Sequence, residues 1–341
     1  MESPSEVHRS SANAEMQTIS LQKIASIVAF ELSHSEEHLN KFLSSQYAYV
    51  DALICHIERF KGKRLRPIVL HLSARAFGGE APLASEVAAL IEMIHLATLC
   101  HDDVLDDADT RRNVPTVNAC WGNKSAVLTG DLLFSRVFEV LGKLDDGRVI
   151  RILSRISRQM CEGELLQIDN RFNVDMDENT YFELIEKKTA MLFGATAELG
   201  ALLAGAKEAD SRRLCAYGRR LGLAFQIVDD CLDLMGMEQT VGKSLGSDLK
   251  NGEFTLPIIH LLATTSGARK QELLNMLKPC SANLDRAALR PYLERTGSIS
   301  YALQAARVEA QRARSEIEFL PPSSAQAALR DFPEYVLERT F

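Results

Sequence analysis

Apolar residues recur at helical spacing along nearly the whole chain from Ile19 onward. Positions three and four apart fall on one face of an α-helix, so this pattern predicts amphipathic helices that pack against one another. The stretches LQKIASIVAFELSHSEEHLNKFL and NKSAVLTGDLLFSRVFEVLGKL carry especially wide apolar stripes. Alternating β-branched runs, which would predict strands, are nearly absent. The pattern therefore predicts an all-α bundle of about a dozen helices.

Breakers rich in glycine and proline separate these helical stretches. They include FGGEAP, RRNVPT and LPPSS, and none has the character of a linker between domains. Residues 19–341 are therefore expected to form a single domain. The preceding stretch is polar and lacks the apolar pattern, so residues 1–18 are expected to be a flexible tail.

Composition narrows the function classes. The 341 residues are 46% hydrophobic, and their net charge of −7 argues against a nucleic-acid partner. The start of the chain lacks the layout of a secretion signal, and no apolar run is long enough to cross a membrane. Seven scattered cysteines without CxxC spacing indicate reduced thiols. We therefore expect a cytoplasmic protein without stable membrane insertion.

Two aspartate clusters of the form D-D-x-x-D stand on strongly apolar segments, CHDDVLDDADTRRN and LAFQIVDDCLDLM. Residues four apart share one helix face, so the outer aspartates of each motif should project together. One acidic cluster is commonly a solvated helix face, but two that face each other in a bundle stay ionised only around cations. Oxygen-rich sites of this kind suit Mg²⁺, which commonly bridges to a phosphate. The members are Asp102, Asp103 and Asp106 in the first motif, and Asp229, Asp230 and Asp233 in the second.

Basic residues beside the acidic motifs fit a phosphorylated ligand. The stretch KGKRLRP places its cations just before Pro67, which suits the first turn of a helix, where free backbone N–H groups attract anions. Two arginines follow the first aspartate motif, and lysines stand in EKKTAML and GKSLGSD. Any one of these is more often a surface residue, but together they predict a diphosphate clamp.

These motifs, taken in order, resemble those of the trans-polyprenyl diphosphate synthases. The matching stretches are GKRLRP, HLATLCHDDVLDDADTRRNVPT, GELLQ, KKTAMLF, GLAFQIVDDCLD, GKSLGSDLKNGEFTLP and FPEYVLERT. The resemblance implies an isoprenoid-synthase-type helical bundle around a deep central cavity, working as a homodimer. It also implies head-to-tail condensation of isopentenyl diphosphate with an allylic prenyl diphosphate.

The resemblance assigns roles to residues by position. Mg²⁺, three ions per site when diphosphate is bound, would be held by Asp102, Asp106, Asp229 and Asp233. Asp103 and Asp230 would support these ligands, and Lys188 would join the six aspartates in catalysis. Isopentenyl diphosphate would be bound by Lys63, Arg66, His95 and Arg112. The allylic diphosphate would be bound by Arg111, Lys188, Thr189, Gln226 and Lys243.

Three positions depart from the family pattern, one of them Ser244, which stands where proline is frequent. Glu253 stands where the family commonly has lysine, and we expect a negative charge there to oppose binding of the allylic diphosphate. Asn113 replaces a usual glycine, a mild change because asparagine tolerates left-handed backbone better than most residues.

Product length is expected to depend on the helix that carries Asp102. Ala97 and Thr98 lie one turn earlier, about 6 Å deeper. In the family, bulky aromatics at these positions close the pocket, so small residues predict a medium- or long-chain all-trans product beyond geranylgeranyl, of the octaprenyl type. Phe134 or Phe138 would form the floor.

Three other functions stay open. One is a short-chain synthase that makes farnesyl or geranylgeranyl diphosphate. Another is a class I terpene cyclase, although such enzymes carry a different second metal motif and do not need GKRLRP. The last is a non-catalytic partner subunit, although such subunits tend to lose one aspartate motif and both are whole here.

Overall fold

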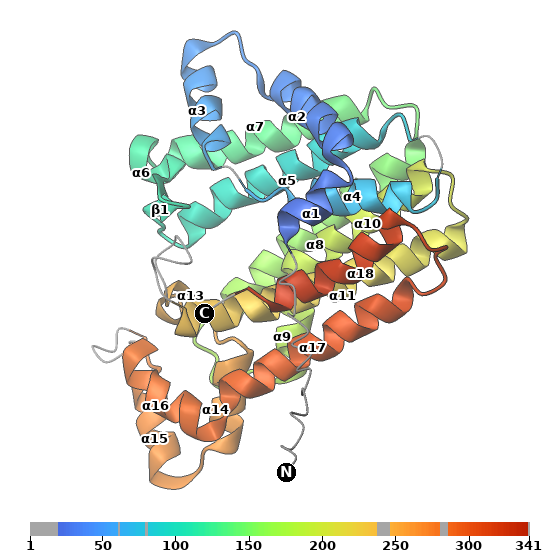
Figure 1. Cartoon of the computed structure of the whole chain (residues 1–341). Coiled ribbons are helices and arrows are strands. Elements are labelled where there is room, and N and C mark those ends of the chain that lie inside the picture. Colours follow the sequence, from blue (N-terminus) through green and yellow to red (C-terminus); the bar gives the residue numbers. More distant parts are fainter. Residues whose placement is uncertain (1–19, 61, 79–80, 237–245, 280–285, 340–341) are drawn as a thin grey trace, which may run out of the picture.

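The computed structural model describes residues 20–60, 62–78, 81–236, 246–279 and 286–339, which form a bundle of helices (Figure 1). The predicted all-α class is confirmed. In these residues the only strands are β1 (Thr110–Arg111) and β2 (Val114–Pro115), which pair antiparallel in one short hairpin. The tail predicted for residues 1–18 lies outside the described residues.

Helix α5 (Ala84–Leu105) carries the first aspartate motif and packs against α2, α4 and α7. Buried apolar side chains occupy most of its circumference, as expected for a helix enclosed by others. Short helices such as α1 and α6 raise the number of helices above the dozen expected. The remaining helices of this half are α1 (Leu21–Ser26), α2 (Ala29–Leu43), α3 (Ala48–Glu58), α4 (Leu65–Arg75), α6 (Val117–Trp121) and α7 (Asn123–Leu141).

Helix α11 (Glu208–Met235) carries the second aspartate motif and packs against α10 and α17. Figure 1 shows α14, α15 and α16 gathered at the end of the molecule opposite α3. The other elements are α8 (Gly147–Asp169), α9 (Glu178–Ile185), the π-helix η1 (Glu186–Ala190), α10 (Met191–Leu203), α13 (Ser247–Lys250), α14 (Leu256–Thr264), α15 (Gly267–Met276), α16 (Arg286–Thr296), α17 (Ser298–Glu316) and α18 (Ser324–Leu337).

Close contact between α10 and α11 fixes the segment that precedes α10. A Cβ atom on Gly218 would overlap the Phe193 carbonyl, and one on Gly222 would lie 2.6 Å from the Cα of Ala190. Glycine is therefore required for the two backbones to approach this closely. The π-helix η1 lies directly before α10, and π-helical turns are frequent at functional sites.

The described residues form three apolar core clusters, centred on α5, on α11 with α14, and on α4 with α18. None of their helices is long and apolar enough to cross a membrane. The six cysteines in this part of the chain are free thiols, as their scattered spacing predicted.

Candidate active site

A deep cavity of about 1100 Å³ is lined by residues of α4, α5, α8, η1, α11 and the end of α18. This volume slightly exceeds the range of about 300–1,000 Å³ typical of small-molecule sites. Both aspartate motifs contribute to its wall, which confirms that the bundle surrounds a central cavity.

On α5, Asp102 and Asp106 line the cavity, whereas Asp103 points to the neighbouring hairpin. Burial raises the pKa of the Asp102 carboxyl to about 6, although Lys188 and Arg111 act to lower it. Asp103 is almost fully buried, and its Oδ1 accepts a 2.7 Å hydrogen bond from Arg111 Nε. Arg111 lines the cavity, whereas Asp103 does not, so Asp103 is connected to the cavity through Arg111.

The hairpin β1–β2 presents two arginines to the cavity. Its turn residues Arg112 and Asn113 both adopt left-handed backbone, with φ of 51° and 61°. That conformation matches the two-residue hairpin turn that favours asparagine or glycine, so Asn113 suits its position. The Arg112 guanidinium donates to the Phe60 carbonyl, and a Cβ on Gly62 would lie 2.5 Å from Arg112 Nη1. Gly62 thus leaves room for the guanidinium.

On α11, Asp229 and Asp230 line the cavity. Arg339, just beyond the end of α18, donates from Nη2 to Asp229 Oδ1 at 2.9 Å. Asp230 is buried and accepts from Tyr181 Oη at 2.6 Å and from Gln226 Nε2 at 2.8 Å. The second motif is therefore contacted by Tyr181 of α9, by Gln226 of α11 itself and by Arg339, just after α18.

The four residues predicted to bind isopentenyl diphosphate all line the cavity. Lys63 Nζ donates to Tyr335 Oη at 3.0 Å, and the Arg66 guanidinium lies 4.7 Å from the centre of the Phe193 ring. Burial lowers the pKa of His95 well below its ordinary value, and the neighbouring arginines lower it further. This region therefore combines several cations with a neutral histidine.

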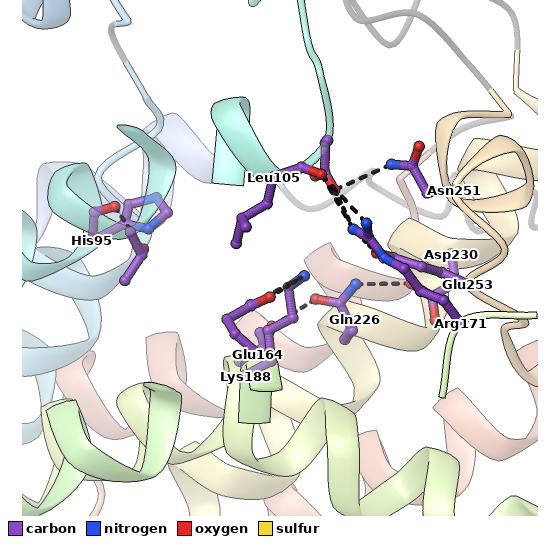
Figure 2. A network of polar contacts seen from close by, with 12 residues as sticks. His95, Leu105, Glu164, Arg171, Lys188, Gln226, Asp230, Asn251 and Glu253 are labelled. Atoms are coloured by element: carbon purple, nitrogen blue, oxygen red, sulfur yellow. Dashed lines mark hydrogen bonds and ion pairs between the residues drawn. The ribbon is translucent and has the colours of Figure 1, made fainter. Parts of the chain in front are cut away.

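The predicted allylic residues on η1 and α11 make two separate sets of polar contacts, and Lys188 and Gln226 are labelled in Figure 2. Lys188 Nζ lies 3.1 Å from Glu164 Oε1, and Thr189 Oγ1 donates to Gln226 Oε1 at 2.7 Å. Burial acts to lower the pKa of Lys188, but Glu164 and Asp102 outweigh it and raise the pKa. Lys188 is therefore a stable cation beside the first aspartate motif.

Glu253 lies in the same acidic region and is paired with Arg171 (Figure 2). Arg171 Nη2 lies 3.0 Å from Glu253 Oε1 and 3.3 Å from Asp106 Oδ1. Asn251 Nδ2 also donates to Asp106 Oδ1, at 3.1 Å. Glu253, which stands where the family commonly has lysine, therefore has a positively charged partner in Arg171.

Comparison with known proteins identifies the family to which this chain belongs. The profile of the polyprenyl synthetase family matches residues 48–290. The chain belongs to that family. It is 36% identical over 323 residues to heptaprenyl diphosphate synthase component 2 of Geobacillus stearothermophilus, covering 94% of this chain and 99% of the relative. It is 35% identical to octaprenyl diphosphate synthase of Escherichia coli (strain K12), with the same coverage. A short chain isoprenyl diphosphate synthase of Methanothermobacter thermautotrophicus is 36% identical, covering 83% of this chain and 88% of that relative.

A solved structure gives the same fold. The polyprenyl synthase of Caulobacter crescentus CB15, complexed with calcium and isoprenyl diphosphate, superposes with a TM-score of 0.89 at 32% identity. The superposition covers 95% of this chain and 99% of that protein. The fold is therefore the isoprenoid-synthase bundle, and this polyprenyl synthetase family member is a prenyltransferase.

Some residues predicted to act in this synthase lie away from the cavity. Asp233 is fully buried and accepts from Ser247 Oγ at 3.3 Å, so it faces α13. Ala97 is also fully buried and packs in the core around α5, whereas its neighbour Thr98 lines the cavity. Phe134 lines the cavity, but Phe138 is 50% exposed and does not. Lys243 lies outside the described residues.

Several cavity-associated residues of the synthase have no counterpart in the sequence predictions. These are Arg171, Tyr181, Tyr335 and Arg339. Tyr335 and Arg339 belong to FPEYVLERT, a stretch that matched the family but carried no assigned role. Tyr181 and Arg171 stand in polar stretches without a distinguishing pattern, so only their contacts reveal them.

The donor set fits a divalent cation. Asp102, Asp106 and Asp229 supply carboxylate oxygens on the cavity wall, and basic side chains lie beside them. In the part of the chain described, no three acidic, histidine or cysteine side chains are close enough to hold an ion by themselves. Mg²⁺ usually binds one or two carboxylates together with substrate phosphates, and the cavity carboxylates are donors of that type.

Proposed function

We propose that this chain is a Mg²⁺-dependent trans-prenyltransferase that condenses isopentenyl diphosphate head-to-tail with an allylic diphosphate. We further propose that it makes a medium- or long-chain all-trans polyprenyl diphosphate. The main support for the reaction is one large cavity that has both aspartate motifs on its wall. The main support for a long product is Thr98, a small residue that lines this cavity one helical turn before Asp102. The names of the octaprenyl and heptaprenyl relatives support the same product class.

Of the four predicted metal ligands, we propose the three that line the cavity, which are Asp102, Asp106 and Asp229. When bound, Mg²⁺ supplies positive charge to the departing diphosphate oxygens. Lys188 and Arg111 add fixed cations there, and these stabilise the departing charge more than they stabilise the ground state. Calcium in the Caulobacter crescentus structure supports a divalent cation in this fold.

Isopentenyl diphosphate would occupy the region of Lys63, Arg66, Arg112 and His95. A neutral His95 donates a hydrogen bond to a phosphate without adding charge. The tail of the product would extend along apolar lining residues such as Leu99, Phe134 and Met160. Such a lining keeps water from the allylic cation.

The reaction can be tested with purified protein, farnesyl diphosphate, isopentenyl diphosphate and Mg²⁺. We expect pyrophosphate release that depends on isopentenyl diphosphate, and dephosphorylated products longer than twenty carbons on chromatography. Release without isopentenyl diphosphate would indicate a cyclase instead. Products that stop at fifteen or twenty carbons would indicate a short-chain synthase.

A heteromeric enzyme is the second candidate, because one relative is named component 2 of its synthase. We nevertheless propose a homodimer. Leu128 on α7 is 66% exposed and Leu165 on α8 is 67% exposed. Leu165 also lines the cavity, so the cavity wall reaches an uncovered apolar surface that a second copy would close. Light scattering after size exclusion should give twice the mass of the chain, and Leu128→Glu should halve it. An active monomer would contradict the homodimer.

We also infer that residues 19–341 act as one domain, because residues from Gly62 to Arg339 line a single cavity. A cytoplasmic location stays a prediction that rests on the free thiols.

A further inference from the structure

Arg171 connects the first aspartate motif to Glu253. Arg171 lies just after the end of α8, and its guanidinium reaches the C-terminal end of α5. There it approaches the Leu105 carbonyl at 3.4 Å and Asp106 Oδ1 at 3.3 Å, while Glu253 Oε1 lies 3.0 Å from the same nitrogen, Nη2. The Arg171 and Glu253 side chains are only 26% and 13% exposed, so solvent screens this pair less than a surface pair.

The position of Arg171 is fixed by contact between two loops. The next residue, Phe172, adopts left-handed backbone with φ of 59°, and its N–H donates to the Gly252 carbonyl at 2.7 Å. Gly252 has φ of 73°, and a Cβ there would lie 2.5 Å from the Phe172 ring. The loop after α8 therefore rests directly on residues 251–253. Arg171 and Glu253 are brought together by this contact and not by chance rotation of exposed side chains.

Asp106 receives its hydrogen bonds on one oxygen. Both Arg171 and Asn251 donate to Oδ1, and among the described residues no hydrogen bond reaches Oδ2. A carboxylate held in this way keeps one orientation and leaves its other oxygen for a cation. Partners that hold a metal ligand from behind generally orient it and tune its affinity.

We propose that Arg171, held by Glu253, is a positioning residue that orients Asp106 for Mg²⁺. This inference rests on the proposed function, because it takes Asp106 as a ligand of the metal. Arg171 does not itself line the cavity, so it acts through Asp106. Glu253 then serves as the anchor of Arg171, and its charge is balanced locally. The acidic residue at a position where the family commonly has lysine therefore supports metal binding instead of opposing the diphosphate.

The test measures metal affinity directly. Mn²⁺ is titrated into the metal-free full-length protein with inorganic pyrophosphate present, and free Mn²⁺ is followed by electron paramagnetic resonance. Arg171→Gln should weaken Mn²⁺ binding by about tenfold or more, the range found when such supporting partners of metal ligands are lost. Glu253→Gln should weaken it less, because Asn251 and Arg171 can still contact Asp106. The KM for isopentenyl diphosphate should not change in either variant.

A matched control is available on α16. Arg290 Nε contacts Glu294 Oε1 at 2.9 Å, but both side chains are mostly exposed and neither lines the cavity. Arg290→Gln removes a comparable arginine–glutamate pair and should leave Mn²⁺ affinity unchanged. Wild-type affinity in Arg171→Gln, or an equal loss in Arg290→Gln, would overturn the proposal.

Arg171→Lys serves if Arg171→Gln does not fold. Lysine keeps the charge but lacks the forked donors that reach Asp106, Glu253 and the Leu105 carbonyl together. It should melt close to wild type and bind Mn²⁺ with intermediate affinity, and unchanged affinity would again overturn the proposal. A wild type that binds Mn²⁺ normally but releases no pyrophosphate from prenyl substrates would refute the proposed function alone. An active wild type whose Arg171 variants keep full Mn²⁺ affinity would refute only the role of Arg171.

Discussion

The hydroxyl of Tyr181 on α9 donates a 2.6 Å hydrogen bond to Asp230 Oδ2 on α11, and both residues are buried. Gln226 donates to the other carboxylate oxygen at 2.8 Å, and Thr189 donates to Gln226. Asp230 is therefore the centre of a chain of contacts that joins η1, α9 and α11. The supporting role expected for Asp230 stays a prediction, and these contacts are what it would act through.

Removing the Tyr181 hydroxyl should affect both stability and turnover. Tyr181→Phe keeps the ring but leaves a buried Asp230 oxygen without this donor, at a cost of about 1–3 kcal/mol. We expect a melting temperature several degrees lower and a reduced kcat, measured by calorimetry and by pyrophosphate release. A variant with wild-type stability and kcat would show that Tyr181 does not orient Asp230.

Asp102 should be essential for turnover but not for folding. Asp102→Asn removes a cavity carboxylate, and losing several kcal/mol of metal-assisted stabilisation lowers the rate at least about a hundredfold. Because burial disfavours the charged form of Asp102, the metal-free variant should melt at the same temperature as wild type or higher. Activity in the variant close to wild type, or a large drop in its melting temperature, would contradict this assignment. Wild-type activity that survives excess chelator would contradict the metal itself.

The stability of the metal-free protein should depend on pH through Asp102. Burial raises the pKa of this carboxyl from 3.8 to about 6, so the folded state binds the proton more tightly than the unfolded state. Stability therefore falls as pH rises through this window, and the full cost remains at higher pH. The melting temperature of Asp102→Asn minus that of wild type should grow between pH 3.8 and about 6, then level off. A difference that does not change with pH would show that Asp102 has an ordinary pKa.

Product length should respond to Thr98 and not to Ala97. Thr98 lines the cavity one turn before Asp102, so Thr98→Phe should block the growing tail and shorten the products towards farnesyl or geranylgeranyl length. Ala97 is packed in the core, so Ala97→Phe should mainly destabilise the fold, by about 1–3 kcal/mol. Chromatography of dephosphorylated products and thermal melting of both variants separate these effects. Shortened products from Ala97→Phe with an unchanged melting temperature would restore Ala97 to the role first predicted for it.

The sequence by itself determined the fold class and most of the cavity. Helical periodicity is local, so the stripes predicted an all-α bundle before any contact was known. The same periodicity placed Asp102 and Asp106 on one face, and both line the cavity. Basic residues of GKRLRP and of the hairpin also line the cavity. Their place could be predicted because members of one family place the same motifs, in the same order, on the same elements of a shared fold.

Only the tertiary structure decided which of two neighbouring helical residues faces the cavity. Ala97 and Thr98 are adjacent in sequence, but successive side chains on a helix point about 100° apart. The rotation of α5 against its neighbours therefore buries Ala97 and exposes Thr98 to the cavity. Asp233 likewise stands one turn after Asp229, yet it is fully buried and accepts a hydrogen bond from Ser247 of α13.

Long-range charge pairing was likewise beyond the reach of the sequence. Arg171 and Glu253 are 82 residues apart, and Arg339 and Asp229 are 110 residues apart. Coulomb attraction depends on distance in space, and that distance is set by how the loops after α8 and α18 return to the cavity. In the sequence, Glu253 indicates only the loss of a lysine that the family commonly has at this position. In the folded protein, Glu253 forms an ion pair with Arg171.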